Sequence, residues 1–472
     1  NIHPGAEEVV DFIDNDCQNG ADYPLTDADV HLRLPSSNTY VYQTAIGNFD
    51  GDEYADIVVS DPSNSIHLIF GSEIASGDVN DYGIVIEDDS HGGTGNPWTA
   101  SKYSIVNWDS NADGMDDLIL YTKSSDASYG NFLLFTAPFT QDLALSDAAT
   151  LLSMDYNYAQ LLNPVGDLNG DGLEDAVVLD RYGDLDQASG FIGGLNNVGQ
   201  VSIFYAPVSD GLTLDDADVV FYGQEENEQL GAEAMGADFD GDGINDLAVG
   251  STKSTLLEGR ISIFLDTPVA TRPIPDIVVD SQAYYTDIFR QFAGPADVNG
   301  DGHADLAFSA VLSDNFAPNS GRAHVLYGPF EPGNHEIYDL NGAVVYGEKA
   351  GDAMGCVRVA GNVSGLGRDQ LLYGSGNHNV MEDGQAGYGA VYLSQEIPEG
   401  HLVLPEGMVK LAAEHESFMG NCWQQNASRR QPFKGGEDIN ADGLDDILLS
   451  ARVPGDEPDS MDQVHLLWGT QQ

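Results

Sequence analysis

One acidic turn sequence recurs seven times along the chain and constrains its fold more than any other feature. The copies begin at Asn48, Asp109, Asp167, Asp238, Asp297, Asn362 and Asp438. They start 58 to 76 residues apart, and each is followed by an apolar run, as in DFDGDGINDLAVG from Asp238. Such a repeat is typical of chains whose units bury their apolar faces against neighbouring units. Seven units of this size fill nearly all of the 472 residues.

Further short apolar runs follow each turn. One set reads SIHLIFG from Ser65, NFLLFTAP from Asn131, VSIFYAP from Val201, ISIFLDT from Ile261, AHVLYGP from Ala323, AVYLSQ from Ala390 and VHLLWGT from Val464. Another reads ADVVFYGQ from Ala217, DIVVDSQ from Asp276 and HLVLPEG from His401. These runs have the length and the β-branched and aromatic content of strands, and no long segment has a helical period. We therefore predict an all-β, seven-bladed propeller with four antiparallel strands in each blade.

The two ends of the chain supply a way to close the ring. The chain ends in the third strand of the seventh unit, so this unit lacks its fourth strand. LTDADVHLRLPSS from Leu25 resembles LDDADVVFYGQ from Leu214, which precedes and includes a predicted outer strand. We predict that residues 28–36 complete the last blade and leave no open edge there. The predicted propeller spans residues 28–472, and residues 1–27 form a separate acidic segment.

Six of the seven turns have the residues of a calcium loop. Side chains at positions 1, 3, 5 and 9 and the backbone carbonyl of position 7 can converge when position 6 permits a sharp turn, and calcium takes six to eight such oxygen ligands. The predicted side-chain ligands are Asn48, Asp50, Asp52 and Asp56; Asp109, Asn111, Asp113 and Asp117; Asp167, Asn169, Asp171 and Asp175; Asp238, Asp240, Asp242 and Asp246; Asp297, Asn299, Asp301 and Asp305; and Asp438, Asn440, Asp442 and Asp446. The predicted carbonyl ligands belong to Tyr54, Met115, Leu173, Ile244, His303 and Leu444. The absence of Cys and His side chains from the ligand positions argues against zinc and copper.

Two turns depart from this pattern. The first turn has Glu53 at position 6, where five others have Gly, so we expect a strained turn and a weaker site there. The turn at 362–370 has Leu366 and Gln370 at positions 5 and 9, and Arg368 adds a positive charge. We therefore expect about six calcium sites and no metal in the loop from Asn362 to Gln370.

The charge of the chain excludes several functions. There are 77 acidic and 17 basic residues, which gives a formal net charge of −60. Nucleic-acid binding needs a basic surface, and so does adsorption to anionic membranes. No apolar run is long enough to cross a bilayer. Extracellular calcium modules bind with dissociation constants of about 0.1–1 mM, so such sites fill outside cells and stay empty in cytosol. We therefore expect an extracellular or cell-surface protein.

The Asp-x-Asn/Asp-x-Asp-Gly-x-x-Asp loops, together with Gly-containing segments such as YGQEENEQLGAEAMGADFDGDG from Tyr222, resemble the FG-GAP repeats of integrin alpha subunits and their bacterial relatives. The resemblance covers about residues 28–472. It implies a seven-bladed propeller with calcium in hairpin loops on one face and with partners bound through loops of the opposite face. Six competent loops are more similar to the secreted bacterial members than to integrins, which usually fill three or four.

The first 24 residues are similar to a metal-binding repeat of secreted bacterial proteins. Val10 and Phe12 replace a Cys and a Gly of that repeat, whereas Asp14, Asp16 and Asp22 remain. A tail or linker from a longer extracellular protein is the alternative interpretation of this segment.

Two weaker features concern cysteines and basic residues. Cys356 and Cys422 occupy similar places in adjacent units, so a disulfide between blades and two buried thiols both stay open as hypotheses. The insertion from Trp423 carries a basic cluster (Arg429, Arg430 and Lys434) that suits an acidic partner, including a second copy, or is a tolerated surface insertion.

No catalytic motif is present in the sequence. The first functional hypothesis is therefore a non-enzymatic calcium-binding module for adhesion or surface assembly, with a protein or glycan ligand. A secreted carbohydrate-active enzyme on the same scaffold is the second hypothesis, and a subunit of an extracellular filament or coat is the third.

Overall fold

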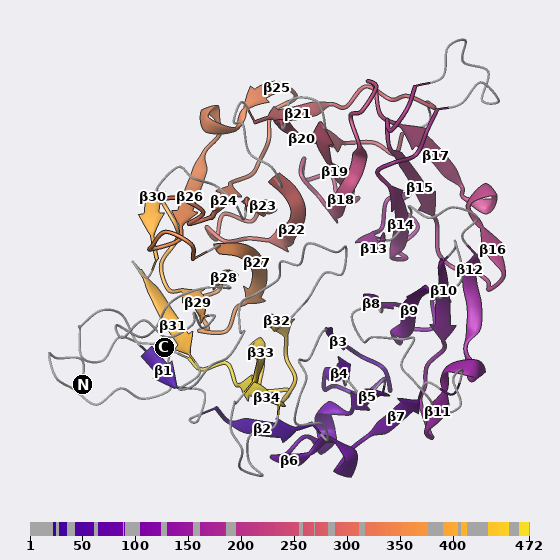
Figure 1. The fold of residues 1–472 in the computed structure, drawn as a ribbon, viewed down its shortest axis with the longest axis vertical. Helices are drawn as coiled ribbons and strands as arrows, with labels where there is room; N and C mark the ends of the chain where they lie inside the picture. Colours follow the sequence, from indigo (N-terminus) through magenta and orange to yellow (C-terminus); the bar gives the residue numbers. More distant parts are fainter. Residues whose placement is uncertain are drawn as a thin grey trace, which may run out of the picture.

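The chain forms a closed ring of seven β-sheets in the computed structural model, as predicted from the repeats (Figure 1). The innermost strands of the seven sheets surround the centre of the ring. The structure describes residues 22–24, 28–34, 43–60, 65–87, 89, 104–123, 130–153, 161–185, 195–253, 258–268, 270–281, 288–310, 317–352, 354–375, 390–404, 407–412, 433–452 and 462–471.

Blades 1 to 4 follow one another along the chain, and each runs from an innermost strand to an outermost one. Blade 1 contains β3 (Thr44–Gly47), β4 (Asp56–Ser60), β5 (Ser65–Ile69), β7 (Ile84–Glu87) and β11 (Leu143–Ala144). Blade 2 contains β8 (Ser104–Trp108), β9 (Asp117–Lys123), β10 (Gly130–Phe135), β12 (Ala149–Ser153) and β16 (Leu212–Thr213). Blade 3 contains β13 (Leu161–Gly166), β14 (Asp175–Asp180), β15 (Gln200–Phe204) and β17 (Val219–Tyr222). Blade 4 contains β18 (Leu230–Ala237), β19 (Asp246–Lys253), β20 (Glu258–Phe264), β21 (Ile277–Asp280) and β25 (Gly333–Glu336).

Blades 5 to 7 complete the ring. Blade 5 contains β22 (Ile288–Ala296), β23 (Asp305–Ala310), β24 (Arg322–Leu326), β26 (Gly342–Tyr346) and β30 (Gly400–Val403). Blade 6 contains β27 (Met354–Gly361), β28 (Gln370–Ser375), β29 (Ala390–Ser394), β31 (Met408–Ala412) and β1 (Asp22–Pro24). Blade 7 contains β32 (Phe433–Glu437), β33 (Asp446–Arg452), β34 (Asp462–Leu467), β2 (Val30–Arg33) and β6 (Gly77–Asp78). The only helices in the described residues are single 3₁₀ turns: η2 (Gly71–Glu73), η3 (Val79–Asp81), η5 (Leu145–Asp147), η7 (Leu214–Asp216) and η8 (Ile337–Asp339). None of them is long or apolar enough to cross a membrane.

The N-terminal strand β2 closes the ring, as predicted. It lies antiparallel to β34, with Val30 opposite Leu466 and Arg33 opposite Gln463. The backbone N–H of Trp468 donates a hydrogen bond to the carboxylate of Asp29 at 2.8 Å, which adds a second link between the two ends. The last blade therefore takes its fourth strand from the beginning of the chain.

Six of the seven sheets have a fifth strand that the sequence pattern does not predict. Each fifth strand pairs in parallel with the outer strand of a blade and belongs, in chain order, to the next blade. The run from His401, which we expected to be an outer strand of its own unit, is β30 and extends the sheet of the preceding blade. Fifth strands such as Leu143–Ala144 are too short to show a period of two, so the sequence gives no signal for them.

Blade 3 has no fifth strand among the described residues. The chain that passes its outer edge contains Pro268, Pro273 and Pro275, which have no N–H to donate to a strand ladder. Within the described part of this segment, one backbone hydrogen bond, from Tyr222 N–H to the carbonyl of Thr271 at 2.9 Å, joins it to β17.

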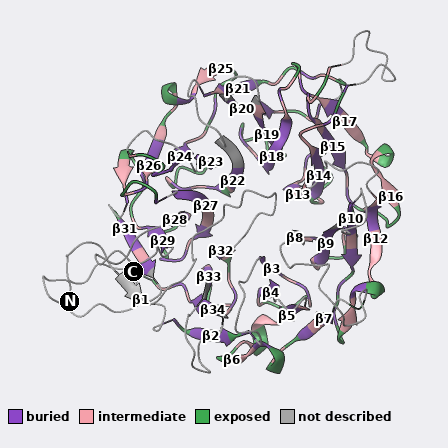
Figure 2. Cartoon of the chain, viewed as in Figure 1, coloured by how far each residue is buried: buried purple, intermediate pink, exposed green. Residues whose placement is uncertain are grey.

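The core lies between the blades. Each apolar cluster combines residues of two adjacent sheets; one, for example, joins Leu32 and Val464 of blade 7 to Ile57 of blade 1. All three side chains are fully buried, and Figure 2 shows the same pattern around the ring, with exposed residues mainly in the outer turns. Burial of one such side chain contributes about 1.5–3 kcal/mol. No blade can bury both of its faces alone.

Several sequence predictions fall on residues outside the described ranges. Cys356 is buried on β27 and is disulfide-bonded, but Cys17 and Cys422 are both outside these ranges, so the Cys356–Cys422 pairing stays a prediction. The same holds for Arg429, Arg430 and most of residues 1–27.

The placement of Lys434 in an exposed basic loop is wrong. Lys434 lies on the innermost strand β32, which begins one residue earlier, and its Nζ donates to the carbonyl of Ile46 at 3.4 Å. Burial lowers the pKa of Lys434, and the nearby carboxylates of Glu437 and Asp116 oppose this shift.

Candidate metal loops

The seven acidic turns are the hairpins that join the first and second strands of each blade. The fourth loop, between β18 and β19, shows how the sequence builds the turn. The carboxylate of Asp238 accepts hydrogen bonds from the backbone N–H groups of Gly241, Asp242 and Gly243, at 2.6, 3.1 and 2.9 Å. Gly241 and Gly243 have φ values of 83° and 92°, which only glycine adopts without cost. The loop therefore wraps around its first residue.

Three carboxylates converge in this fourth loop. Oxygen atoms of Asp238, Asp240 and Asp246 lie within 4.8 Å of one another. In the first loop, where position 1 is Asn48, the converging acids are those at positions 3, 5 and 9: Asp50, Asp52 and Asp56. Like charges at such distances repel each other unless a cation lies between them. All-oxygen donors of this kind suit a hard cation such as calcium.

Two buried side-chain oxygens among the predicted ligands have no hydrogen-bond partner. Oδ1 of Asp246 is one of them, although the residue is only 2% exposed, and Oδ1 of Asn111 in the second loop is the other. A buried acceptor without a partner is costly in a folded protein. A cation bound at the predicted ligands would satisfy both atoms, so the residues present fit the metal that the sequence implies.

The remaining predicted loops keep the same wrapped backbone but gather their acids less closely. The carboxylate of Asp167 accepts three backbone N–H groups in the third loop, and the carboxylate of Asp297 does the same in the fifth. Of the seven hairpins, all of which are described, only the first and fourth bring three acids within 4.8 Å. The second, third, fifth and seventh loops have Asn at position 3, and in three of them its side-chain amide donates to the Asp at position 5.

In all six predicted loops, the side chain at position 5 fixes the backbone at position 7. The Asp at position 5 accepts the backbone N–H of the residue two places later, at 2.8 to 3.0 Å. These residues are Tyr54, Met115, Leu173, Ile244, His303 and Leu444, whose carbonyls are the predicted ligands. Position 7 is therefore fixed by the turn whatever side chain it carries.

The acid at position 9 has a structural role that the sequence analysis missed. Asp56 is fully buried at the start of β4, and its two oxygens accept backbone N–H groups from Phe49 in the loop and from Gly71 after the third strand. The third, fifth and seventh loops repeat both bonds. In the fourth loop Phe239 makes the first bond and no donor makes the second, which leaves Oδ1 of Asp246 without a partner.

Burial raises the pKa of these position 9 acids. It raises the pKa of Asp56, Asp246 and Asp446 to about 7, and that of Asp175 and Asp305 to about 6. Their backbone hydrogen bonds act against the shift, whereas the negative charge of the other loop acids adds to it. In the absence of a cation, each of these five loops therefore holds a carboxyl group that ionises less readily than a free one.

The expected strain at Glu53 is not found in the first loop. Glu53 does not have a positive φ, whereas Gly51 at position 4 does, with φ of 81°. Position 4 has positive φ in all seven loops, and it is Ala112 in the second and Ala441 in the seventh, with φ of 61° and 58°. The conformational constraint on residue type therefore lies at position 4 as well as at position 6.

The sixth loop folds with other side chains in place of acids. Gln370 replaces the position 9 acid: its Oε1 accepts the N–H of Ser364 at 3.0 Å, and its Nε2 donates to the carbonyl of Ser394 at 2.6 Å. Asn362 accepts the N–H of Gly367 through its side chain at 3.1 Å. The prediction that this loop holds no metal stays a prediction.

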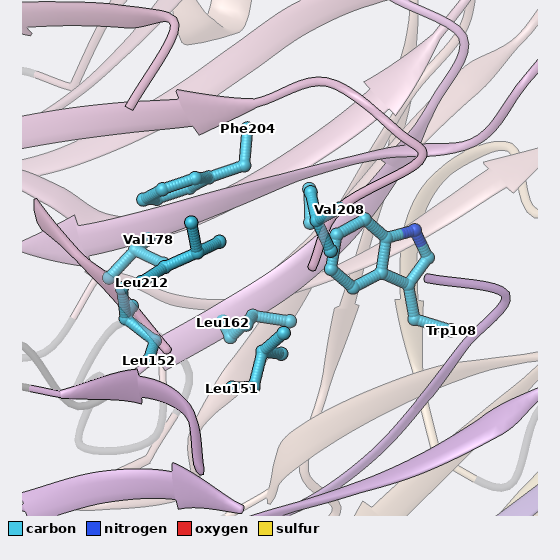
Figure 3. Close-up of a pocket in the computed structure, with 9 residues that line it drawn as sticks. Trp108, Leu151, Leu152, Leu162, Val178, Phe204, Val208 and Leu212 are labelled. Atoms are coloured by element: carbon cyan, nitrogen blue, oxygen red, sulfur yellow. The ribbon is translucent and has the colours of Figure 1, made fainter. Parts of the chain in front are cut away.

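An apolar cavity lies between blades 2 and 3 (Figure 3). Trp108, Val178 and Phe204 are among the side chains around it, and the indole nitrogen of Trp108 is directed to the carbonyl of Glu174 at 2.7 Å. Every lining residue is apolar, so this cavity has no group for acid–base or nucleophilic chemistry.

No family model matches the chain, but three curated proteins are similar to it. A phosphatidylinositol-glycan-specific phospholipase D from Bos taurus is 26% identical over 244 residues, which are 49% of this chain and 27% of the relative. Integrin alpha-IIb from Homo sapiens is 26% identical over 342 residues, which are 64% of this chain and 29% of the relative. Integrin alpha-IIb from Mus musculus is 30% identical over 191 residues, which are 38% of this chain and 17% of the relative. The chain spans less than a third of each of these relatives.

Solved structures give a weaker likeness. The crystal structure of BBS1N in complex with ARL6DN, soaked with mercury, has a TM-score of 0.45 and 8% identity, and covers 94% of this chain and 95% of that chain. The lead-soaked crystal of the same complex has a TM-score of 0.43 and 9% identity. The propeller assignment rests on the strand pairing of the chain itself. The similarity to integrin alpha-IIb agrees with the FG-GAP resemblance of the loops.

Proposed function

We propose that this chain is a calcium-binding propeller module that binds a protein or glycan ligand outside the cell and catalyses no reaction. One observation carries the calcium part of the proposal. In the fourth loop three carboxylates converge, and the buried Oδ1 of Asp246 has no protein donor. One divalent cation would both relieve the repulsion among the three carboxylates and give Oδ1 of Asp246 a partner.

The metal would be held by the ligands predicted from the sequence, up to six sites in all. The bound ion would supply positive charge that neutralises the loop acids, and the chain itself supplies the rest of the site. The backbone N–H groups orient Asp238 and its equivalents, while the buried position 9 acid ties the loop to the third strand. Calcium would then rigidify one face of the ring.

The ligand would bind on the face opposite these loops. Support comes from the FG-GAP resemblance and from the similarity to integrin alpha-IIb, which covers 64% of this chain. The hairpins that carry the acids are confined to one end of the blades, so the connections at the other end can vary without disturbing them. Adhesion, surface assembly and self-association are the activities that such a face would serve, on a secreted bacterial protein.

Calcium titration by calorimetry, with the bound metal counted by elemental analysis, tests the metal sites. We expect several equivalents of calcium bound at millimolar concentration, and an absence of binding would overturn the proposal. Binding to arrays of glycans and extracellular proteins, compared in calcium and in chelator, tests the ligand. Release of products from a polysaccharide or from a glycolipid anchor would contradict the non-enzymatic part.

A further inference from the structure

The loops of neighbouring blades are joined by hydrogen bonds through loop position 8. In four of the seven pairs of neighbouring blades, the backbone N–H at this position donates to the carbonyl of the first residue in the preceding blade's loop. Asp116 donates to Asn48 at 2.7 Å, and Asn245 donates to Asp167 at 2.8 Å. Ala55 makes the same bond to Asp438 across the ring closure, at 3.1 Å. The first residue of one loop is therefore anchored by the next loop.

An acid at position 8 makes this link reciprocal. Oδ2 of Asp116 accepts the backbone N–H of Asn48 at 2.9 Å, so both backbone groups of Asn48 are held by one residue. The fifth and sixth loops repeat this geometry. Asp369 donates its N–H to the carbonyl of Asp297 at 2.9 Å and accepts the N–H of Asp297 through Oδ2 at 2.8 Å.

The second member of that pair of loops lacks the acids of positions 5 and 9. Leu366 and Gln370 stand where the other loops have Asp, yet Asp369 remains and makes the same two bonds that Asp116 makes in a complete loop. Arg368 adds a third contact, from Nη1 to the carbonyl of Val298 at 3.3 Å, while its Nη2 is fixed by the carbonyl of Gln395 at 2.8 Å. All three contacts reach the first two residues of the fifth loop.

We propose that the sixth loop is a support for the fifth metal site, and that Asp369 is a positioning residue for the ligand Asp297. This inference rests on the proposed calcium binding. Asp297 is the residue around which the fifth loop wraps, since its carboxylate accepts the N–H groups of Gly300, Asp301 and Gly302. Fixing its backbone on both sides presets the direction of that carboxylate before the metal arrives.

The expected size of the effect follows from the behaviour of other metal sites. Removal of a residue that orients a metal ligand typically weakens affinity by roughly 10–100-fold. The effect should appear at one site in blade 5, although the substitution lies in blade 6. A residue that serves only folding would instead lower stability equally with and without metal.

The experiment compares calcium titrations of the full chain with those of Asp369→Ala, Asp369→Asn and Leu366→Ala, with melting temperatures in calcium and in chelator. Asp369→Ala should weaken one site by roughly 10–100-fold and reduce the gain in melting temperature that calcium provides. Asp369→Asn should restore most of the affinity, because an amide oxygen accepts the same N–H. Leu366→Ala, at the exposed position 5 of the same loop, should behave as the wild type.

Two further variants show which calcium site is weakened and distinguish this weakening from misfolding. Asp301→Ala removes a ligand of the fifth loop, and adding Asp369→Ala to it should cause no further loss of bound calcium. Arg368→Ala removes the contacts of Arg368 to Val298 and Gln395 but keeps both bonds between Asp369 and Asp297, so it should weaken the same site by less. The inference is overturned if Asp369→Ala leaves every affinity unchanged, or if it lowers the melting temperature equally in calcium and in chelator. A wild-type chain that takes up no calcium would instead refute the proposed function.

Discussion

His31 and His465 lie directly opposite each other in the two strands that close the ring, and their Nδ1 atoms are 3.0 Å apart. A hydrogen bond between two imidazoles needs a proton on one nitrogen and a free lone pair on the other. Burial, together with the charge of His31, lowers the pKa of His465 to about 3. His465 therefore stays neutral, and the pair joins the first and last parts of the chain.

Replacement of His31 by Ala should lower the free energy of unfolding by about 1 kcal/mol, the usual net contribution of one hydrogen bond. Urea unfolding followed by circular dichroism measures the change. His335→Ala is the matched control, because that half-buried ring on the outer strand β25 bonds only four residues away, to the carbonyl of Glu331. Equal losses in the two variants would show that the imidazole pair does not stabilise the closure.

Asp240→Asn should lower the melting temperature in calcium and leave it unchanged or higher in chelator. The amide oxygen still accepts the N–H of Asp242, so the turn is kept, while one of the three converging charges is removed. Differential scanning calorimetry in both conditions measures the effect. Asp215→Asn, which removes an exposed acid of η7 that belongs to none of the acidic hairpins, is the control. A loss in chelator as large as that in calcium would contradict the metal role.

The calcium-free protein should become more stable as the pH falls from 8 to 6. The folded state raises the pKa of Asp56, Asp246 and Asp446 from 3.8 to about 7, so it binds these protons more tightly than the unfolded chain. Stability from this source is present at low pH and is lost as the pH rises through 7, on the order of 1 kcal/mol per carboxyl. His465 has a lowered pKa and acts in the opposite direction below about pH 6.5.

Melting curves in chelator at pH 8, 7 and 6 measure this trend. Repeating them in 1 M salt separates the buried acids from the general repulsion of the acidic surface, because the screening length there is only about 3 Å. A trend that vanishes in salt would assign it to the surface charge. Calcium binding at pH 6.5 should also release protons, which calorimetry in buffers of different ionisation enthalpy detects.

Ala112→Gly and Ala441→Gly should each stabilise the protein by about 0.5–1 kcal/mol. Both alanines have the left-handed φ that costs a non-glycine residue about 1–2 kcal/mol, and the greater freedom of glycine in the unfolded chain offsets part of the gain. The five other loops have Gly at this position. Unfolding in chelator measures the effect apart from metal binding. A destabilised Ala112→Gly variant would refute this account of the turn.

The propeller and its closure were predictable because the repeat is long and its strands are periodic. The resemblance of residues 25–37 to the outer-strand region of blade 3 was enough to assign β2 to the last blade. The fifth strands escaped prediction because two to four residues show no period and their partners lie in another unit. Lys434 was misplaced because the sequence does not mark where the insertion ends and β32 begins.

The candidate ligands of the loops were predictable from the sequence, but the contacts that position them in space were not. The spacing identified Asp238, Asp240 and Asp246, which the structure brings together. It gave no sign that the position 9 acids also accept two backbone N–H groups, since that depends on where the third strand ends. Position 8 did carry a signal, because Asp116, Asp369 and Asp445 recur there, but its meaning needs the neighbouring blade.

The outermost strands place the unit of sequence and the unit of structure out of phase. Except at the junction of blades 3 and 4, a segment cut at the sequence repeat would carry a strand that belongs to the preceding sheet and would lack the strand that finishes its own. Gain or loss of one repeat therefore changes the composition of two sheets at once. Circular permutation between repeats would likewise separate outer strands from their sheets at both new ends. The sharing of outer strands between repeats therefore opposes changes in the number of blades.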